Sequence, residues 1–173
     1  RKQEIKKILP IFIDVINKFK SYQFVIAAAP SIESEFYLSI VKNNSIKIIH
    51  DNTYNLLIHS KAALVTSGTA TLETALLKIP QLVCYKTSFV SFFIAKRLVK
   101  LNYISLVNLI LNKEVVKELI QKNCNAKKIT EELKELLMRK NKSILKEYEL
   151  LFKKIGNNKA SKITSKLIIN SIK

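Results

Sequence analysis

The chain has 173 residues, 48% of them hydrophobic, and its 30 Lys and Arg against 13 Asp and Glu give a formal net charge of +17. This length and composition predict a folded domain with a substantial core and exclude an intrinsically disordered chain, and no apolar run reaches the ~20 residues of a membrane-spanning helix. The basic residues are spread along the sequence without a nucleic-acid-binding motif, so we expect compositional bias with a contribution from an anionic membrane surface, and no nucleic acid partner.

The sequence opens inside a helical pattern at Arg1, and we expect it to be part of a longer protein. The first apolar residues recur at helical spacing, which predicts a helix. After them come short apolar runs that end at Pro or at polar turns, which predict strands. The elements predicted for the first part are, in order, a helix over residues 5–20, a strand over 23–29, a helix that begins after Ser31, a strand over 46–49 and a short helix ending at His59.

The second part continues this alternation. Its predicted elements are a strand over residues 62–65, a helix that ends near Pro80, a strand over 81–85, a helix over 89–99, an extended piece over 103–107 that ends at Asn108, and helices from Glu114 onward with breaks near 123–125, 139–141 and 156–158. Strands alternating with helices predict an α/β fold with a parallel sheet flanked by helices. The strands at 62–65 and 81–85 are expected to be neighbours in that sheet.

The cysteine and histidine positions do not indicate a metal site. Cys84 and Cys124 are far apart in the sequence and form neither a disulfide framework nor a zinc motif, which fits a reducing compartment. His50 and His59 have no metal-ligand spacing to each other or to the cysteines. We therefore predict no metal and no other cofactor.

A small-residue turn follows the predicted strand at 62–65. Gly68, one of only two glycines, stands where the chain turns sharply into a helix, whose free N–H groups and partial positive charge suit a phosphate. Glu73 lies about one turn into that helix with no Ser or Thr three residues before it, so its carboxylate is available to sugar hydroxyls. The alternative is an ordinary turn with a solvated glutamate. A GxGxxG or P-loop motif is absent, which argues against the common dinucleotide and ATP sites.

The run Ser-Gly-Thr-Ala-Thr-Leu-Glu-Thr-Ala-Leu at residues 67–76 resembles lipid-A-disaccharide synthase. Blocks at residues 94–100, 103–109 and 114–121 extend the resemblance, and Arg1 and Glu4 match the end of the family's Gly-Ser-Arg-x-x-Glu motif. The chain departs from the family at four positions. The family usually has proline where Val107 and Lys117 stand, and Gly-Arg where Asn112 and Lys113 stand.

The resemblance implies a Rossmann-like, UDP-sugar-binding domain over residues 1–140, the C-terminal domain of a two-domain glycosyltransferase of the GT-B type. Residues 141–173 would be extra C-terminal helices that pack on a missing N-terminal domain or on a partner subunit, leaving apolar surface exposed. The general base would lie in that N-terminal domain, so no catalytic residue is expected in this chain. The residues expected to bind UDP are Arg1, Ser67, Gly68, Thr69, Ala70, Glu73 and Asn108.

The implied reaction transfers 2,3-diacylglucosamine from UDP to 2,3-diacylglucosamine 1-phosphate, which forms the β-1,6-linked lipid A disaccharide and releases UDP. The resemblance also implies a cytoplasmic enzyme that binds peripherally to the inner membrane of a Gram-negative-type bacterium. Association of two copies into a homodimer is a further implied possibility. Two alternatives stay open. One is the UDP-sugar-binding domain of another enzyme, such as a UDP-N-acetylglucosamine epimerase, and the other is a non-catalytic basic binding fragment.

Overall fold

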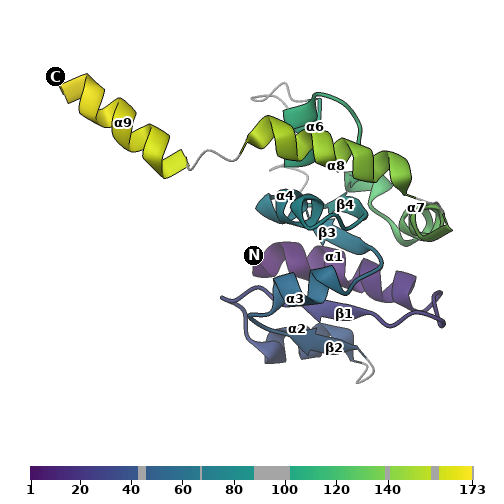
Figure 1. The fold of residues 1–173 in the computed structure, drawn as a ribbon. Coiled ribbons are helices and arrows are strands. Elements are labelled where there is room, and N and C mark those ends of the chain that lie inside the picture. The colour runs from purple at the N-terminus through teal and green to yellow at the C-terminus, as the bar shows by residue number, and fades with distance from the viewer. Residues whose placement is uncertain (43–45, 67, 88–101, 139–140, 157–159, 173) are drawn as a thin grey trace.

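Helices and parallel strands alternate through most of the chain in a computed structural model that describes residues 1–42, 46–66, 68–87, 102–138, 141–156 and 160–172 (Figure 1). The strands are β1 (Val25–Ala27), β2 (Lys47–Ile49), β3 (Ala63–Thr66), β4 (Gln81–Tyr85) and β5 (Lys117–Ile120). The helices are α1 (Lys2–Ile16), α2 (Ser34–Val41), α3 (Thr53–Ile58), α4 (Thr69–Leu76), α6 (Leu106–Leu111), α7 (Ala126–Met138), α8 (Lys142–Ile155) and α9 (Ala160–Ile172), with a short 3-10 helix η1 (Gln121–Asn123).

All the pairings between these strands are parallel, which confirms the predicted α/β class. One sheet contains β1 and β2, and the other has the order β3-β4-β5. The predicted neighbours at 62–65 and 81–85 pair as β3 and β4, with Val65 opposite Val83. Strand β4 is central and its first four residues are buried, as expected for a strand covered on both faces.

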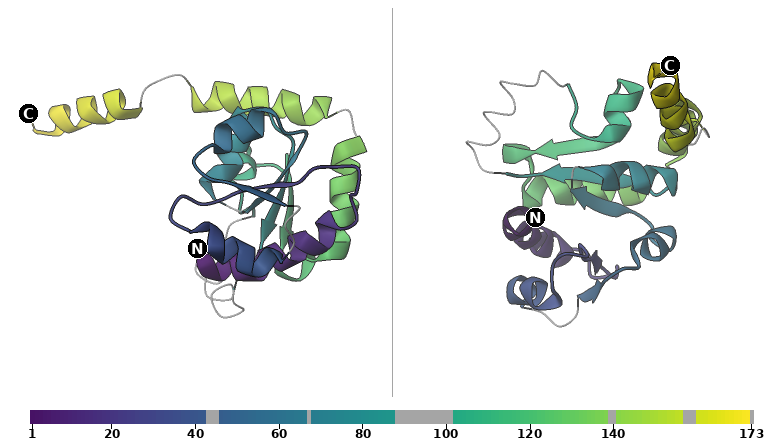
Figure 2. Two further views of the ribbon diagram at one scale, coloured as in Figure 1. Left: turned by 90° about the horizontal axis from the view of Figure 1, so that it is seen from below. Right: turned by 90° about the vertical axis from the view of Figure 1, so that its left-hand side faces the viewer.

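Helices cover both faces of the three-stranded sheet (Figure 2). On one face, Val15 of α1 and Leu133 of α7 pack against Leu82 and Leu119. On the other face, Ala75 of α4 packs with side chains of α6 and α8 against Val83. Burial of each large apolar side chain contributes roughly 1.5–3 kcal/mol relative to exposure, so these two layers supply most of the cohesion of this half of the molecule.

Two predicted elements around Asn108 are wrong. The predicted extended piece at 103–107 overlaps α6, because the buried Ser105 caps that helix by accepting a hydrogen bond from the backbone N–H of Asn108 at 3.3 Å. The predicted helix after Glu114 is replaced over residues 117–120 by β5, which pairs with β4. The predicted helix at 89–99 lies outside the described residues.

The C-terminal helices differ from each other in their packing. Tyr148 and Leu151 of α8 are 2% and 0% exposed and belong to the same core cluster as Val83. Helix α8 therefore packs one face on its own chain, and packing of residues 141–173 on a further domain or a partner subunit stays a prediction. Helix α9 extends away from the body in Figures 1 and 2, and its Leu167 remains 64% exposed. Within the described residues, no helix combines the length and the hydropathy that a membrane span requires.

Candidate nucleotide-binding site

The turn between β3 and α4 presents an open helix N-terminus. Gly68 is the N-cap of α4, and among the residues that the structure describes no side-chain hydrogen bond caps the start of that helix. Its φ of +143° is a conformation that residues with a side chain rarely adopt, and a Cβ placed on it would meet no atom within 4 Å. Thr69 and Ala70 are exposed, and the predicted Ser67 lies outside the described residues. The start of α4 is thus accessible to an anionic ligand.

Glu73 stands one turn into α4, as predicted. Its side chain is half-buried, and among the described residues neither a hydrogen bond nor an ion pair engages its carboxylate. Hydroxyl groups of a sugar are donors that such a carboxylate accepts strongly. Within the described part of the chain, Glu73 is therefore free for the contact predicted from the sequence.

Thr71, which is fully buried, connects this turn to α6. Its hydroxyl donates to the carbonyl oxygen of Gly68 at 2.8 Å and accepts from the backbone N–H of Leu106 at 3.3 Å. The side-chain amide of Gln81 donates to the carbonyl oxygen of Thr71 at 2.8 Å. The start of α6 is consequently held against the first turn of α4.

The side chain of Asn108 is enclosed within the protein and is 0% exposed. Its Nδ2 donates to the carbonyl oxygen of Val116 and to Oε1 of Glu118, both at 2.8 Å. Its Oδ1 accepts from the backbone N–H groups of Val115 at 2.8 Å and Val116 at 3.0 Å. A nucleotide would have to displace one of these bonds to reach this side chain. The geometry favours a role in positioning the α6–β5 segment, and direct contact with UDP stays a prediction.

Glu118, like Asn108, holds the segment between α6 and β5 in place through hydrogen bonds. Its carboxylate accepts from the N–H of Ile104 at 2.9 Å, from the N–H of Ser105 at 2.9 Å and from the hydroxyl of Ser105 at 2.8 Å, besides Asn108. Sequence reasoning missed Glu118, which fell within a predicted helix, where an isolated glutamate resembles any surface residue. It also missed Thr71, although that residue lies inside the small-residue run.

Arg1 is the N-cap of α1, and its guanidinium lies 3.6 Å from the carboxylate of Glu4. Its side chain is 88% exposed, so it is free to reach a ligand. The departures from the family pattern are accommodated locally: Lys113 pairs with Glu147 at 2.6 Å, and Lys117 pairs with Glu114 at 3.1 Å. Val107 is fully buried, and Asn112 ends α6 in the left-handed region with φ 53°.

The loop after β4 is fastened to the end of β5. Lys86 donates to the carbonyl oxygen of Cys124 at 3.3 Å, and the N–H of Thr87 donates to Gln121 at 3.1 Å. Cys84 and Cys124 are both 0% exposed free thiols, and the neighbouring Cys124 thiol together with burial raises the pKa of Cys84. Both thiols therefore belong to the core, and the raised pKa of Cys84 disfavours its thiolate.

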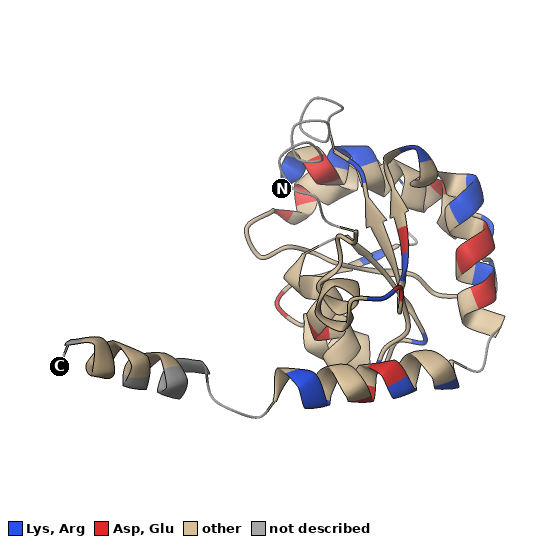
Figure 3. Cartoon of the chain, turned by 90° about the horizontal axis from the view of Figure 1, so that it is seen from above, with Lys and Arg blue, Asp and Glu red and all other residues tan. Residues whose placement is uncertain are grey.

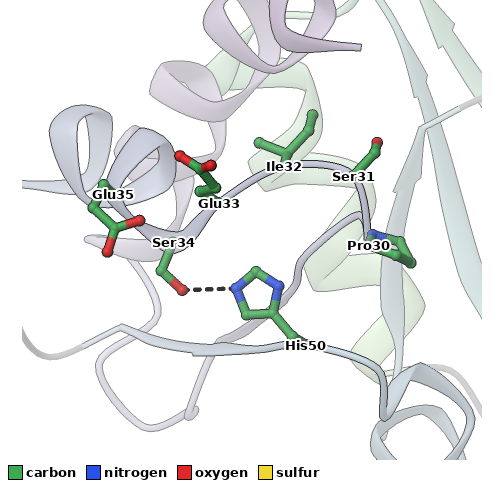
Figure 4. A pocket seen from close by; sticks show the side chains of 7 residues that line it. All are labelled: Pro30, Ser31, Ile32, Glu33, Ser34, Glu35 and His50. Atoms are coloured by element: carbon green, nitrogen blue, oxygen red, sulfur yellow. Dashed lines mark hydrogen bonds between the residues drawn. The ribbon is translucent and has the colours of Figure 1, made fainter.

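A shallow depression of about 520 Å³ lies at the carboxyl ends of β1 and β2 (Figure 4). Its lining includes Glu33, Glu35 and His50, and the His50 ring is hydrogen-bonded to the hydroxyl of Ser34 at 2.7 Å. Two carboxylates disfavour a phosphate there, so the α4 turn is the better phosphate site. His59 contacts the carbonyl oxygen of Asn55 at 2.8 Å, and the described residues contain no group of three potential metal-ligating side chains.

Cations and anions are interleaved along the outer helices. Figure 3 shows Lys and Arg alternating with Asp and Glu on α7 and α8. The described part of the surface therefore does not concentrate the charge of +17 at the Gly68 turn. A phosphate at that turn would therefore depend on backbone N–H groups and on individual side chains.

Parallel strands covered by helices, with a glycine turn that leads into an open helix N-terminus at a strand's carboxyl end, define an α/β domain of the Rossmann-like kind. Residues 1–170 match the family of lipid-A-disaccharide synthetase, and the chain belongs to that family.

Three relatives illustrate the similarity. The chain is 37% identical over 142 residues to lipid-A-disaccharide synthase of Persephonella marina, which covers 75% of this chain and 37% of that protein. Identity is 32% over 186 residues with the synthase of Sulfurihydrogenibium sp., covering 97% of this chain and 48% of the relative. It is 34% over 178 residues with that of Francisella philomiragia, covering 97% and 46%. The chain thus spans less than half the length of these relatives.

Proposed function

We propose that this chain is the donor-nucleotide-binding part of a glycosyltransferase of lipid A biosynthesis. The reaction transfers 2,3-diacylglucosamine from UDP to 2,3-diacylglucosamine 1-phosphate, forming the β-1,6-linked disaccharide and UDP. The observation that carries this proposal is the open Gly68 turn with the carboxylate of Glu73, which has no partner among the described residues, in a chain that belongs to the lipid-A-disaccharide synthetase family. Following the resemblance, the general base belongs to the acceptor-side domain of the longer protein.

The arrangement suits a nucleoside diphosphate. The first N–H groups of α4 and the positive end of its dipole bind the pyrophosphate, and Arg1 adds a mobile cation. The same donors stabilise the charge that develops on UDP as it leaves. Glu73, one turn further along, accepts hydrogen bonds from the two ribose hydroxyls. Asn108 and Glu118 act through the backbone by holding the start of α6 beside this turn.

We further propose a cytoplasmic location at the inner-membrane surface and a homodimer or interdomain contact that uses the C-terminal helices. The net charge of +17 supports attraction to anionic lipid headgroups. The exposed apolar side chains of α9, including Ile168 and Ile169 at 53% and 57% exposure, support a protein contact on that helix.

Calorimetric titration of UDP into the full-length protein tests the nucleotide site. Charge-assisted hydrogen bonds contribute about 1.5–3 kcal/mol each, so Glu73→Gln, which keeps the shape and part of the bonding, is expected to weaken binding by at least about tenfold. The matched control is Glu131→Gln, an exposed glutamate on α7, which should bind UDP as the parent does.

Gly68→Val is expected to weaken binding more than Glu73→Gln does. A side chain strains the turn at φ +143° and enters the open space in which the pyrophosphate would lie. Circular dichroism checks that both variants remain folded. Parent-like affinity of Glu73→Gln would exclude the ribose contact, and parent-like affinity of both variants would exclude UDP binding at this turn.

A further inference from the structure

The first turn of α4 is held from inside the protein. The carbonyl oxygen of Gly68 accepts two hydrogen bonds from Thr71, from its backbone N–H at 3.2 Å and from its hydroxyl at 2.8 Å. The first turn of a helix frays easily, because its N–H groups have no partners within the helix. The bond from the Thr71 hydroxyl therefore restrains the Gly68 peptide at the point where the chain enters α4.

The same hydroxyl reaches α6. It accepts from the backbone N–H of Leu106, the first residue of that helix, at 3.3 Å. The preceding residue, Ser105, is held from β5, because its N–H and its hydroxyl donate to Glu118 at 2.9 and 2.8 Å. The start of α6 is thus held on two sides, by Glu118 of β5 and by Thr71 of α4.

Gln81, at the start of β4, holds Thr71 through its carbonyl group. The Nε2 of Gln81 donates to the carbonyl oxygen of Thr71 at 2.8 Å and to the hydroxyl oxygen of Tyr148 on α8 at 3.4 Å. Thr71, Gln81 and Tyr148 are 0%, 1% and 2% exposed, and hydrogen bonds in such buried surroundings are stronger than in water. Helix α8 contacts both α4 and α6, beside which it lies in Figure 1. A buried chain of hydrogen bonds therefore connects the Gly68 turn with α6 and α8.

The second buried threonine of α4 lacks such a connection. Thr74 is 1% exposed, and its hydroxyl donates to the carbonyl oxygen of Ala70 at 2.7 Å, within the same helix. Thr71 and Thr74 match in size, burial and helix, but among the described residues only the Thr71 hydroxyl joins α4 to another element. The effect of this connection can therefore be separated from the effect of a buried hydroxyl alone.

We propose that Thr71 is a positioning residue of the nucleotide site, whose hydroxyl holds the Gly68 turn against α6 and so presents the first N–H groups of α4 to the pyrophosphate. This inference rests on the proposed function and names the side chain that fixes the geometry of the turn. Thr71 is fully buried, so it acts through Gly68 and not by contact with the nucleotide. A turn that samples other arrangements binds with an affinity reduced by the fraction of molecules in the competent one.

Calorimetric titration of UDP into full-length variants tests this role. Thr71→Val keeps the shape of the side chain but removes both hydrogen bonds of its hydroxyl, so the affinity for UDP should fall about three- to tenfold. Thr71→Ser keeps the hydroxyl and should bind within about twofold of the parent. Thr74→Val is the matched control, which removes a buried hydroxyl from the same helix and should also bind within about twofold of the parent.

Amide hydrogen exchange, followed by nuclear magnetic resonance without nucleotide, measures the connection itself. The N–H of Leu106 should exchange at least about tenfold faster in Thr71→Val than in the parent, a larger change than that at Val83 in the central strand. If Thr71→Val does not fold, as judged by circular dichroism, Thr71→Ala takes its place. It also lacks the hydroxyl and relieves any crowding by the valine methyl groups, and it should weaken UDP binding as well.

Unchanged exchange at Leu106, or binding of UDP by Thr71→Val within twofold of the parent, would overturn the inference. Equal losses of affinity in Thr71→Val and Thr74→Val would show that the stability of α4, and not its connection to α6, sets the affinity, and would overturn it as well. A parent protein that does not bind UDP would overturn the proposed function and this inference together. Parent-like binding by Thr71→Val, beside weakened binding by Glu73→Gln, would overturn this inference alone.

Discussion

Asn108 uses both ends of its side-chain amide to close the segment between α6 and β5. The carbonyl end accepts from two backbone N–H groups, and the amino end donates to a backbone carbonyl and to Glu118. Such a buried group contributes little net energy while it is satisfied, but its loss leaves several partners unpaired. Four of the hydrogen bonds that hold this segment therefore depend on this one side chain.

Asn108→Ala is expected to lower the free energy of unfolding by about 2–4 kcal/mol, because the N–H groups of Val115 and Val116 lose their acceptor in a buried site. Urea unfolding followed by circular dichroism measures this change. Asn55→Ala, on the exposed surface of α3, is the matched control and should stay within about 0.5 kcal/mol of the parent. Parent-like stability of Asn108→Ala would show that water replaces the amide at little cost.

Local sequence patterns predict some residues of the candidate site and miss others. Gly68 and Glu73 are recognisable because a turn, a helix start and a carboxylate follow each other within a few residues. The roles of Glu118 and Thr71 depend on partners that are far away in the sequence, such as the pairing of Glu118 with Ile104 and that of Thr71 with Leu106. Spacing within one element carries no information about such contacts.

Strands, too, are predicted well where local sequence determines them and poorly where distant contacts do. Strand β4 has the predicted bounds, because Pro80 precedes a short apolar run that is buried on both faces. Strand β5 was missed because its Lys117 and Glu118 give an edge strand the appearance of an amphipathic helix. Its pairing with β4 and the bonds to the Glu118 carboxylate decide the conformation.

The buried side chain of Tyr148, whose pKa is raised, anchors helix α8 in the core. Burial raises the pKa of Tyr148 to about 12, and the hydrogen bond from Gln81 only partly offsets this. Because the folded protein holds this proton more tightly than the unfolded chain, the contribution of Tyr148 is fully present below pH ~10 and is lost as the pH rises toward 12. We expect the free energy of unfolding to fall by roughly 2 kcal/mol over that interval from this residue.

Tyr148→Phe isolates this effect from the titration of lysines in the same pH range. At pH 8 the free energy of unfolding of the variant should lie within about 1 kcal/mol of that of the parent, because the substitution removes only a 3.4 Å hydrogen bond. Its loss of stability between pH 10 and 12 should be smaller than that of the parent, measured by urea unfolding at both pH values. An identical loss in both proteins would show that Tyr148 ionises normally.

At the scale of the whole molecule, the two sheets and their shared helix α1 form the framework for the candidate site. The open start of α4 follows one sheet, and Arg1 begins the helix that packs on both. Backbone groups at this position can hold a pyrophosphate, but the proposed reaction also needs an acceptor and a base. We propose that both are provided by polypeptide outside these 173 residues.

The 173-residue chain alone is therefore expected to form no disaccharide, whereas the full-length protein should form it. The measurement is release of UDP with the diacylated donor and the diacylated 1-phosphate acceptor both present. Calorimetric titration of UDP and circular dichroism show whether the shorter chain is folded and binds nucleotide, which separates loss of catalysis from loss of structure.

Full-length Glu73→Gln, assayed at saturating donor, should recover most of the parent rate if Glu73 acts in binding alone. Turnover by the 173-residue chain would place the catalytic base within it and would contradict the proposed division of roles.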